Sequence, residues 1–221
     1  PSDRAGQVVA RPGLTDPEAG GRNLETSMML IEETPVPDSS LPVDAFKAHL
    51  RLGSGFGQDD VQDVVLRSFL RAALAAIEAR TSKALITRSF EWSLNQWRND
   101  CAQVLPVAPI TALTRVALVT RHGTQTDVAP EAYWLERDSQ RPRLRPTGST
   151  LPQIPEMGSV LIAFDAGFGA SWDNLPVDLQ QAVLMLAAHY YEYRNDTALS
   201  DGCMPFGVSS LIERFKPMRL G

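Results

Sequence analysis

The spacing of apolar residues changes abruptly between residues 81 and 86. Residues 59–81 carry apolar side chains at intervals of three and four, the period of an amphipathic helix. In residues 86–95, which follow, the residues of one face alternate with polar residues. This period of two is typical of a half-buried strand. The residues of that face are Ile86, Arg88, Phe90, Trp92 and Leu94, with Arg88 the one charged member. A chain with this change of period must combine helices with a sheet.

The same two periods locate further elements. Strand patterns recur in LTRVALVT (113–120), AYWLER (132–137) and SVLIAF (159–164). Helix patterns cover residues 41–52, 59–81 and 176–194. We therefore predict an α+β fold that is mainly a helical bundle, with three main helices plus a short C-terminal helix. A small antiparallel β-sheet is expected as an insertion at residues 84–165.

The ends of the chain differ in composition from its middle. Residues 1–27 mix proline, glycine and charged residues without an apolar period, and such a segment buries too little surface to order itself. We expect a flexible N-terminal arm at residues 1–40, a folded domain at 41–200 and a partner-binding C-terminal tail at 201–221.

Composition and charge exclude several classes of protein. Hydrophobic residues make up 43% of the chain and charged residues 21%, close to the averages of soluble globular domains. The longest apolar run, residues 182–188, is far shorter than the roughly 20 residues that span a bilayer, so we expect a cytoplasmic protein without a membrane segment.

The formal net charge of -5 argues against a protein whose main role is to bind DNA tightly. Cys101 and Cys203 have neither zinc-site nor disulfide spacing, which indicates reduced thiols.

A polar cluster ends the last long helix. His189 and Glu192 lie three residues apart, and a pair on one helical face can hold a metal or pass a proton. A metal site needs more ligands, and neither His49 nor His122 has an acidic partner at ligand spacing. We therefore expect no metal, no cofactor and no catalytic residue, and a metal-dependent enzyme is the weaker alternative. The cluster is instead assigned to packing and to a subunit interface made by His189, Tyr190, Tyr191 and Tyr193.

An arginine-rich segment, RDSQRPRLRP, forms the densest basic patch. Its arginines are Arg137, Arg141, Arg143 and Arg145. Such a patch can contact phosphate, so a small nucleic-acid-binding module that uses the Arg137–Arg145 loop is an alternative function. Aromatic residues for base stacking are not interleaved with the arginines, which favours a solvated loop.

The C-terminal segment FGVSSLIERFKPMRLG carries an apolar stripe. Val208, Leu211, Ile212 and Phe215 fall at helical spacing over about two turns. Because an isolated helix of this length is marginal in water, another surface must receive the stripe. Two alternatives are equally open: the helix packs on its own domain, or it is a helix-in-groove anchor for another protein.

The order of these motifs resembles the head-tail connector, or adaptor, proteins of long-tailed bacteriophages and gene transfer agents. The resemblance covers about residues 41–216, is weak in 97–158, and does not extend to the N-terminal arm. The motifs that carry it are PVDAFKAHLRL, then DDVQDVVLRSFLRAALAAIEARTSKALITRSFEWSL, then VLIAFDAGFG, LPVDLQQAVLMLAAHYYEYR and MPFGVSSLIERF.

The resemblance implies a structural adaptor rather than an enzyme. Members of this family form a ring, with twelve copies expected, beneath the capsid portal in the neck of the particle. DNA passes through the ring without specific binding, and a stopper or tail terminator protein follows on the tail side. Assembly would take place in the bacterial cytoplasm. By the same resemblance, the expected portal-binding residues are Phe206, Val208, Leu211, Ile212 and Phe215.

Overall fold

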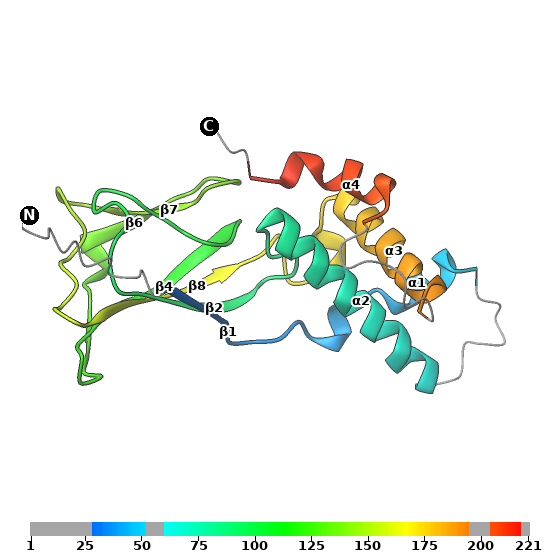
Figure 1. Cartoon of the computed structure of the whole chain (residues 1–221), viewed down its shortest axis with the longest axis horizontal. Coiled ribbons are helices and arrows are strands. Elements are labelled where there is room, and N and C mark those ends of the chain that lie inside the picture. The colour runs from blue at the N-terminus through cyan, green and yellow to red at the C-terminus, as the bar shows by residue number, and fades with distance from the viewer. Residues whose placement is uncertain (1–27, 52–59, 195–203, 218–221) are drawn as a thin grey trace, which may run out of the picture.

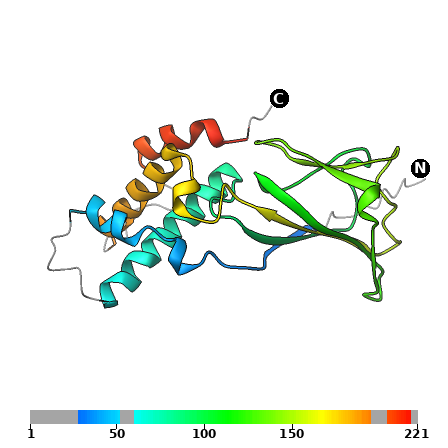
Figure 2. The same cartoon turned by 180° about the vertical axis from the view of Figure 1, so that it is seen from behind.

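The described residues form an elongated molecule with helices at one end and strands at the other (Figure 1). The computed structural model describes residues 28–51, 60–194 and 204–217. Figure 2 shows from behind that the two halves meet at a narrow joint beside α2. Most of the expected arm, residues 1–27, and the part of the expected tail around Cys203 lie outside the described residues.

The helical half is built from four α-helices in the described ranges. They are α1 (Val43–His49), α2 (Asp60–Thr81), α3 (Val177–Glu192) and α4 (Phe206–Ile212), and α4 continues into the 3-10 helix η5 (Glu213–Phe215). Each of the helices predicted at 41–52, 59–81 and 176–194 is present, as is the C-terminal helix. None of the helices in these ranges is long and apolar enough to cross a membrane.

The other half is a sandwich of two antiparallel sheets. The larger sheet has the order β1-β2-β8-β4-β5 and the smaller one β3-β7-β6. The strands of the larger sheet are β1 (Met28–Glu32), β2 (Arg88–Leu94), β8 (Ser159–Ala166), β4 (Ile110–Val119) and β5 (Gln125–Asp127). Those of the smaller sheet are β3 (Gln103–Val104), β7 (Arg143–Pro146) and β6 (Tyr133–Glu136).

The predicted fold class, a mainly helical bundle with a small inserted sheet, is wrong about the relative amounts of helix and sheet. The sheet is not a small insertion into a helical bundle, because the described residues contain eight strands in two sheets with a hydrophobic core of their own. The four strands predicted from alternation correspond to β2, β4, β6 and β8. The missed strands are too short to show a period, as in β3 and β5, or lack a clear alternation, as in β1 and β7.

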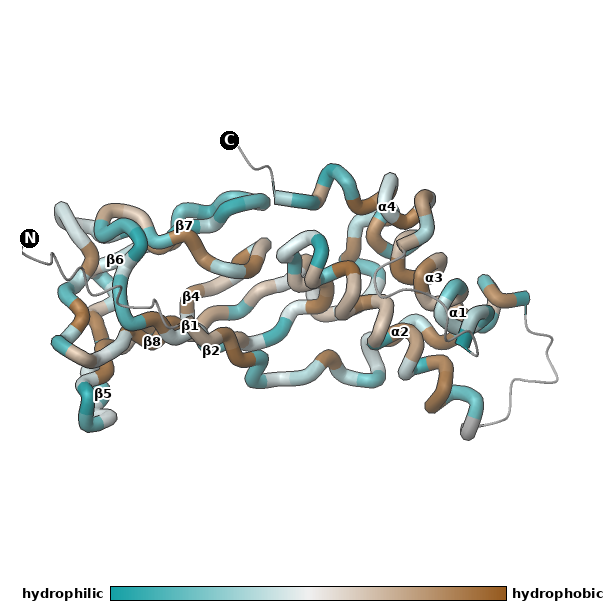
Figure 3. Tube along the Cα trace, viewed as in Figure 1, coloured by the Kyte–Doolittle hydropathy of each residue, from teal (hydrophilic) through white to brown (hydrophobic). Residues whose placement is uncertain are grey.

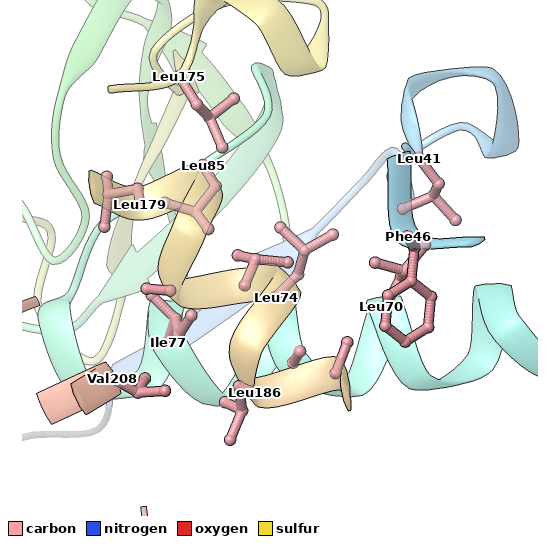
Figure 4. Close-up of a cluster of buried hydrophobic side chains, with 14 of the residues drawn as sticks. Leu41, Phe46, Leu70, Leu74, Ile77, Leu85, Leu175, Leu179, Leu186 and Val208 are labelled. Carbon is pink, nitrogen blue, oxygen red and sulfur yellow. The ribbon is translucent and has the colours of Figure 1, made fainter. Parts of the chain in front are cut away.

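Two hydrophobic cores stabilise the two halves. In the helical core, Leu70 of α2 packs near Phe46 of α1, and Ile77 lies near Val208 of α4 (Figure 4). The core of the sandwich lies between the sheets and includes Trp92, Ile162 and Leu144, one from each of three strands. Each half therefore buries its own apolar face.

Two of the chain segments that cross the joint between the halves lie beside each other. Gly167 and Gly169 follow directly after β8, and Gly169 forms a bridge with Ile86 before β2. Gly167 has a φ of +147°, and a Cβ atom there would meet the Cα atom of Thr87 at 2.3 Å. Only glycine permits this approach of the two backbones.

Arg88 explains the charged position on the apolar face of β2. Its Nη2 atom donates hydrogen bonds to Glu78 Oε2 of α2 at 2.8 Å and to Glu32 Oε2 of β1 at 3.0 Å. Glu78 Oε1 also accepts from Arg88 Nη1 at 2.9 Å and from the backbone N–H of Leu85 at 2.7 Å. Burial opposes the charge of Arg88, but the bonds to Glu78 and Glu32 outweigh it and raise the pKa of the guanidinium. The Arg88 cluster thus joins α2, β2 and β1.

We predict that Arg88→Ala lowers the free energy of unfolding by about 3 kcal/mol, because Glu78 loses its partner in a mostly buried place. Urea denaturation measures this change. The matched control is Arg115→Ala, which breaks an exposed pair with Asp127 and should cost less than about 1 kcal/mol. Equal losses in the two variants would contradict the structural role of the Arg88 cluster.

Candidate functional site

The aromatic cluster at the end of α3 is split between the helical core and solvent. Tyr191 packs edge-on against Phe69 of α2, with ring centroids 5.9 Å apart, and Tyr190 also lies against the helical core. His189 lies half-buried between them and Tyr193, whose ring centroid is 4.7 Å away. Tyr193 is 47% exposed. The cluster therefore leaves His189 and Tyr193 at the surface, where a second molecule can reach them.

His189 and Glu192 do not form a site for chemistry in the described residues. Glu192 is exposed, and no hydrogen bond or ion pair joins it to His189 in the described part of the chain. Within residues 28–51, 60–194 and 204–217, no three His, Cys, Asp or Glu side chains gather closely enough to hold a metal ion. Nothing in this geometry therefore supports the metal-dependent alternative.

The arginine-rich segment is a strand and a tight loop rather than a solvated loop throughout. Arg143 and Arg145 belong to β7, and both reach Glu136 on the neighbouring strand β6. The hydrogen bond from Arg145 lowers the pKa of Glu136, so this carboxylate stays ionised and offsets part of the positive charge. Arg137 donates through Nη2 to the backbone O of Thr111 at 3.3 Å. Three of the four arginines therefore have partners within the sandwich.

The tip of the β6–β7 hairpin contacts the C-terminal helix. Gln140 accepts a hydrogen bond from Lys83 Nζ at 2.9 Å and donates through Nε2 to the backbone O of Arg214 at 3.2 Å. Arg214 in turn pairs with Asp178 at the start of α3, at 2.9 Å. Burial lowers the pKa of Lys83, although Asp138 nearby favours its charged form. The structure therefore brings the arginine-rich segment into contact with the C-terminal tail, although we predicted them from the sequence as two separate candidate sites.

The apolar stripe of the tail faces its own domain. Val208 and Ile212 are fully buried in the helical core, where α4 packs against α3, and Leu211 and Phe215 lie at the margin of the same core. Phe215 packs edge-on against Phe168, with ring centroids 6.3 Å apart. Of the five expected portal-binding residues, Phe206 alone is exposed, with 88% of its surface accessible. Of the two alternatives left open by the sequence, the chain itself adopts the packed one.

Two further apolar surfaces were missed by the sequence analysis. In β1, four successive large apolar residues are each at least 41% exposed: Met28, Met29, Leu30 and Ile31. On β6, Trp134 is 50% exposed and lines a pocket of about 340 Å³ with Cys101 and Arg145. The apolar run MMLI at residues 28–31 could have indicated β1. No strand was predicted there because the run lies within residues 1–40, which were expected to form a flexible arm.

Comparisons with solved structures found several similar chains, and three of them are described here. A chain from the neck of an empty gene transfer agent particle, computed with C6 symmetry, is 52% identical, with a TM-score of 0.80. A chain from the neck of a native particle, computed with C12 symmetry, is 49% identical, with a TM-score of 0.76. A chain from the virion of a native gene transfer agent particle is 51% identical, with a TM-score of 0.78. In each case the match covers 87% of this chain and 97% of the other.

Two other comparisons gave no match. No model of a known protein family matches the chain, and no curated protein sequence matches it.

The burial of the tail predicts unequal effects of substitutions within it. Ile212→Ala should lower the free energy of unfolding by about 2 to 5 kcal/mol, because it opens a cavity in the helical core. Phe206→Ala should change it by no more than about 0.5 kcal/mol, because the side chain has few contacts to lose. Chemical denaturation of both variants measures the difference. A stable Ile212→Ala protein would show that the tail does not belong to the core.

Proposed function

The chain belongs to the head-tail connector, or adaptor, family of long-tailed bacteriophages and gene transfer agents, and we propose that its copies form a ring beneath the capsid portal. It is a structural adaptor of the particle neck, where it joins head to tail. The observation that carries this function is 49 to 52% identity to neck and virion chains over 97% of their length. Neither the metal-dependent enzyme nor the nucleic-acid module is favoured by these relatives.

The proposed ring contains twelve copies around the axis of the particle. The related necks were computed with C6 and C12 symmetry, and the higher of these symmetries supports a twelvefold ring. DNA passes through the middle of this ring. A chain with a formal net charge of -5 attracts phosphate weakly, which suits a channel through which DNA moves without being held.

The portal contact is proposed at the exposed start of α4. Val208 and Ile212 are taken up by the helical core, so they support the helix and leave Phe206 as the side chain that a partner can bury. Aromatic residues that become buried at an interface often carry much of its binding energy. Leu211 and Phe215 are half-buried and would border this contact.

Contacts on the other surfaces complete the proposed assembly. His189 and Tyr193 at the end of α3 are proposed to face a neighbouring subunit, while Tyr190 and Tyr191 hold that helix end against the core. A stopper or tail terminator protein is the proposed partner on the tail side. The role is non-enzymatic, which the identity of the relatives as neck proteins supports.

We predict that Phe206→Glu abolishes binding to portal rings while the protein keeps its stability, because a charge at the centre of an apolar contact stays unpaired. Binding is measured by co-sedimentation of the purified chain with portal rings, and stability by thermal unfolding. The expected result is a loss of binding of about tenfold or more.

The matched control is Val64→Glu, which adds the same charge to an exposed apolar residue of α2. This variant should bind portal rings as the unchanged chain does. If Phe206→Glu also binds without loss, the portal contact lies elsewhere on the chain.

A further inference from the structure

The edge strand β1 exposes an uninterrupted apolar run. All residues of β1 except Glu32 are apolar (Figure 3). Met28, Leu30 and Ile31 are each 41% exposed, and Met29 is 56% exposed. Among the described residues the strand pairs with β2 alone, over five residues in regular register without a bulge. Monomeric proteins usually protect such edges with lysine, proline or a bulge, because a regular apolar edge accepts another strand. None of these protections occurs within β1.

On this edge, the backbone groups of β1 have no partner strand among residues 28–51, 60–194 and 204–217. Glu33 N–H donates to Ser89 O at 3.0 Å, so these two opposite residues form a hydrogen-bonded pair. Antiparallel ladders alternate, and Met29 and Ile31 therefore also bond toward β2. The N–H and C=O groups of Met28, Leu30 and Glu32 then point away from the sheet. This is the arrangement that a further strand needs.

The opposite side of the sandwich offers a different surface. β5 forms the other edge of the larger sheet, and the short helix η3 (Pro130–Ala132) connects it directly to β6, the edge of the smaller sheet. The hydrogen bond from Arg137 to Thr111 of β4 confirms that β6 ends on this side. The exposed Trp134 lies on β6. Each copy therefore has one apolar edge at β1 and one exposed aromatic residue on the side away from it.

A second copy of the chain fits these two surfaces. A closed ring of identical subunits requires a heterologous contact, in which one surface of each copy meets a different surface of the next. A symmetric contact of β1 with itself would close a dimer and leave no ring.

We infer that the β1 edge of one copy joins the β4–β6 side of its neighbour, with the apolar side chains of β1 against Trp134. This inference rests on the proposed ring and names one of its subunit contacts. The larger sheet of each subunit is thereby extended toward the next subunit around the ring. It also explains why four large apolar residues remain exposed on a strand that leaves its edge open.

Met29→Lys tests the contact through assembly. The side chain of Met29 lies opposite Ser93 on the outer face of the sheet, so a lysine there is compatible with the fold of one copy. Incorporation of this variant into particle necks, measured by quantitative immunoblotting of purified particles, should fall about tenfold or more. Met157→Lys, which changes an 81% exposed methionine in a loop, is the matched control and should be incorporated normally. Normal incorporation of Met29→Lys would overturn the inference.

Cross-linking in assembled particles identifies the neighbour. With Cys101 and Cys203 replaced by serine, Met29→Cys and Trp134→Cys together should give a ladder of covalent multimers with a flexible bis-maleimide. Either cysteine alone should give none. Dimers from Met29→Cys alone would overturn the inference in favour of a symmetric contact. If the chain is present in necks but the double variant gives no ladder, the inference fails and the proposed function stands. If the unchanged chain is absent from necks, both fail.

Discussion

The contact of Arg88 with Glu78 and Glu32 connects the two halves of the molecule. Each half has its own hydrophobic core, so burial alone would not fix how the halves sit relative to each other. The guanidinium bonds one carboxylate from α2 and one from β1, while its own strand lies in the larger sheet. The same cluster therefore holds β1 in place at the sheet edge. The charge on the apolar face of β2 thus links a helix of one half to two strands of the other.

The sequence predicts elements where a period persists over several residues. The alternation of Phe90, Trp92 and Leu94 identifies β2, and the helical spacing in 59–81 identifies α2 almost to its ends. β7 could not be found in this way, because Leu144 is its one fully buried side chain between two arginines. β1 could not be found either, because all five of its residues are exposed and no alternation marks it. The balance between helix and sheet was therefore misjudged.

The candidate sites illustrate a second limit of sequence periodicity. The stripe of Val208 and Ile212 correctly indicates an apolar helical face, but a stripe does not specify which surface receives it. In the folded chain that surface is α3, and Phe206, which lies just ahead of the stripe, is exposed. The exposure of Trp134 could not be predicted for a related reason. In a strand as short as β6, the sequence pattern does not show which of the alternating residues faces solvent. Exposure depends on the second sheet, which no local pattern describes.

A reconstruction of the particle neck tests whether copies of this chain form a ring there. Particles that carry this chain would be imaged by electron cryo-microscopy, and the neck reconstructed without imposed symmetry. We predict a closed ring of copies between portal and tail, each with both halves arranged as in Figure 1. A neck without density for this chain, or with the chain as isolated copies, would contradict it.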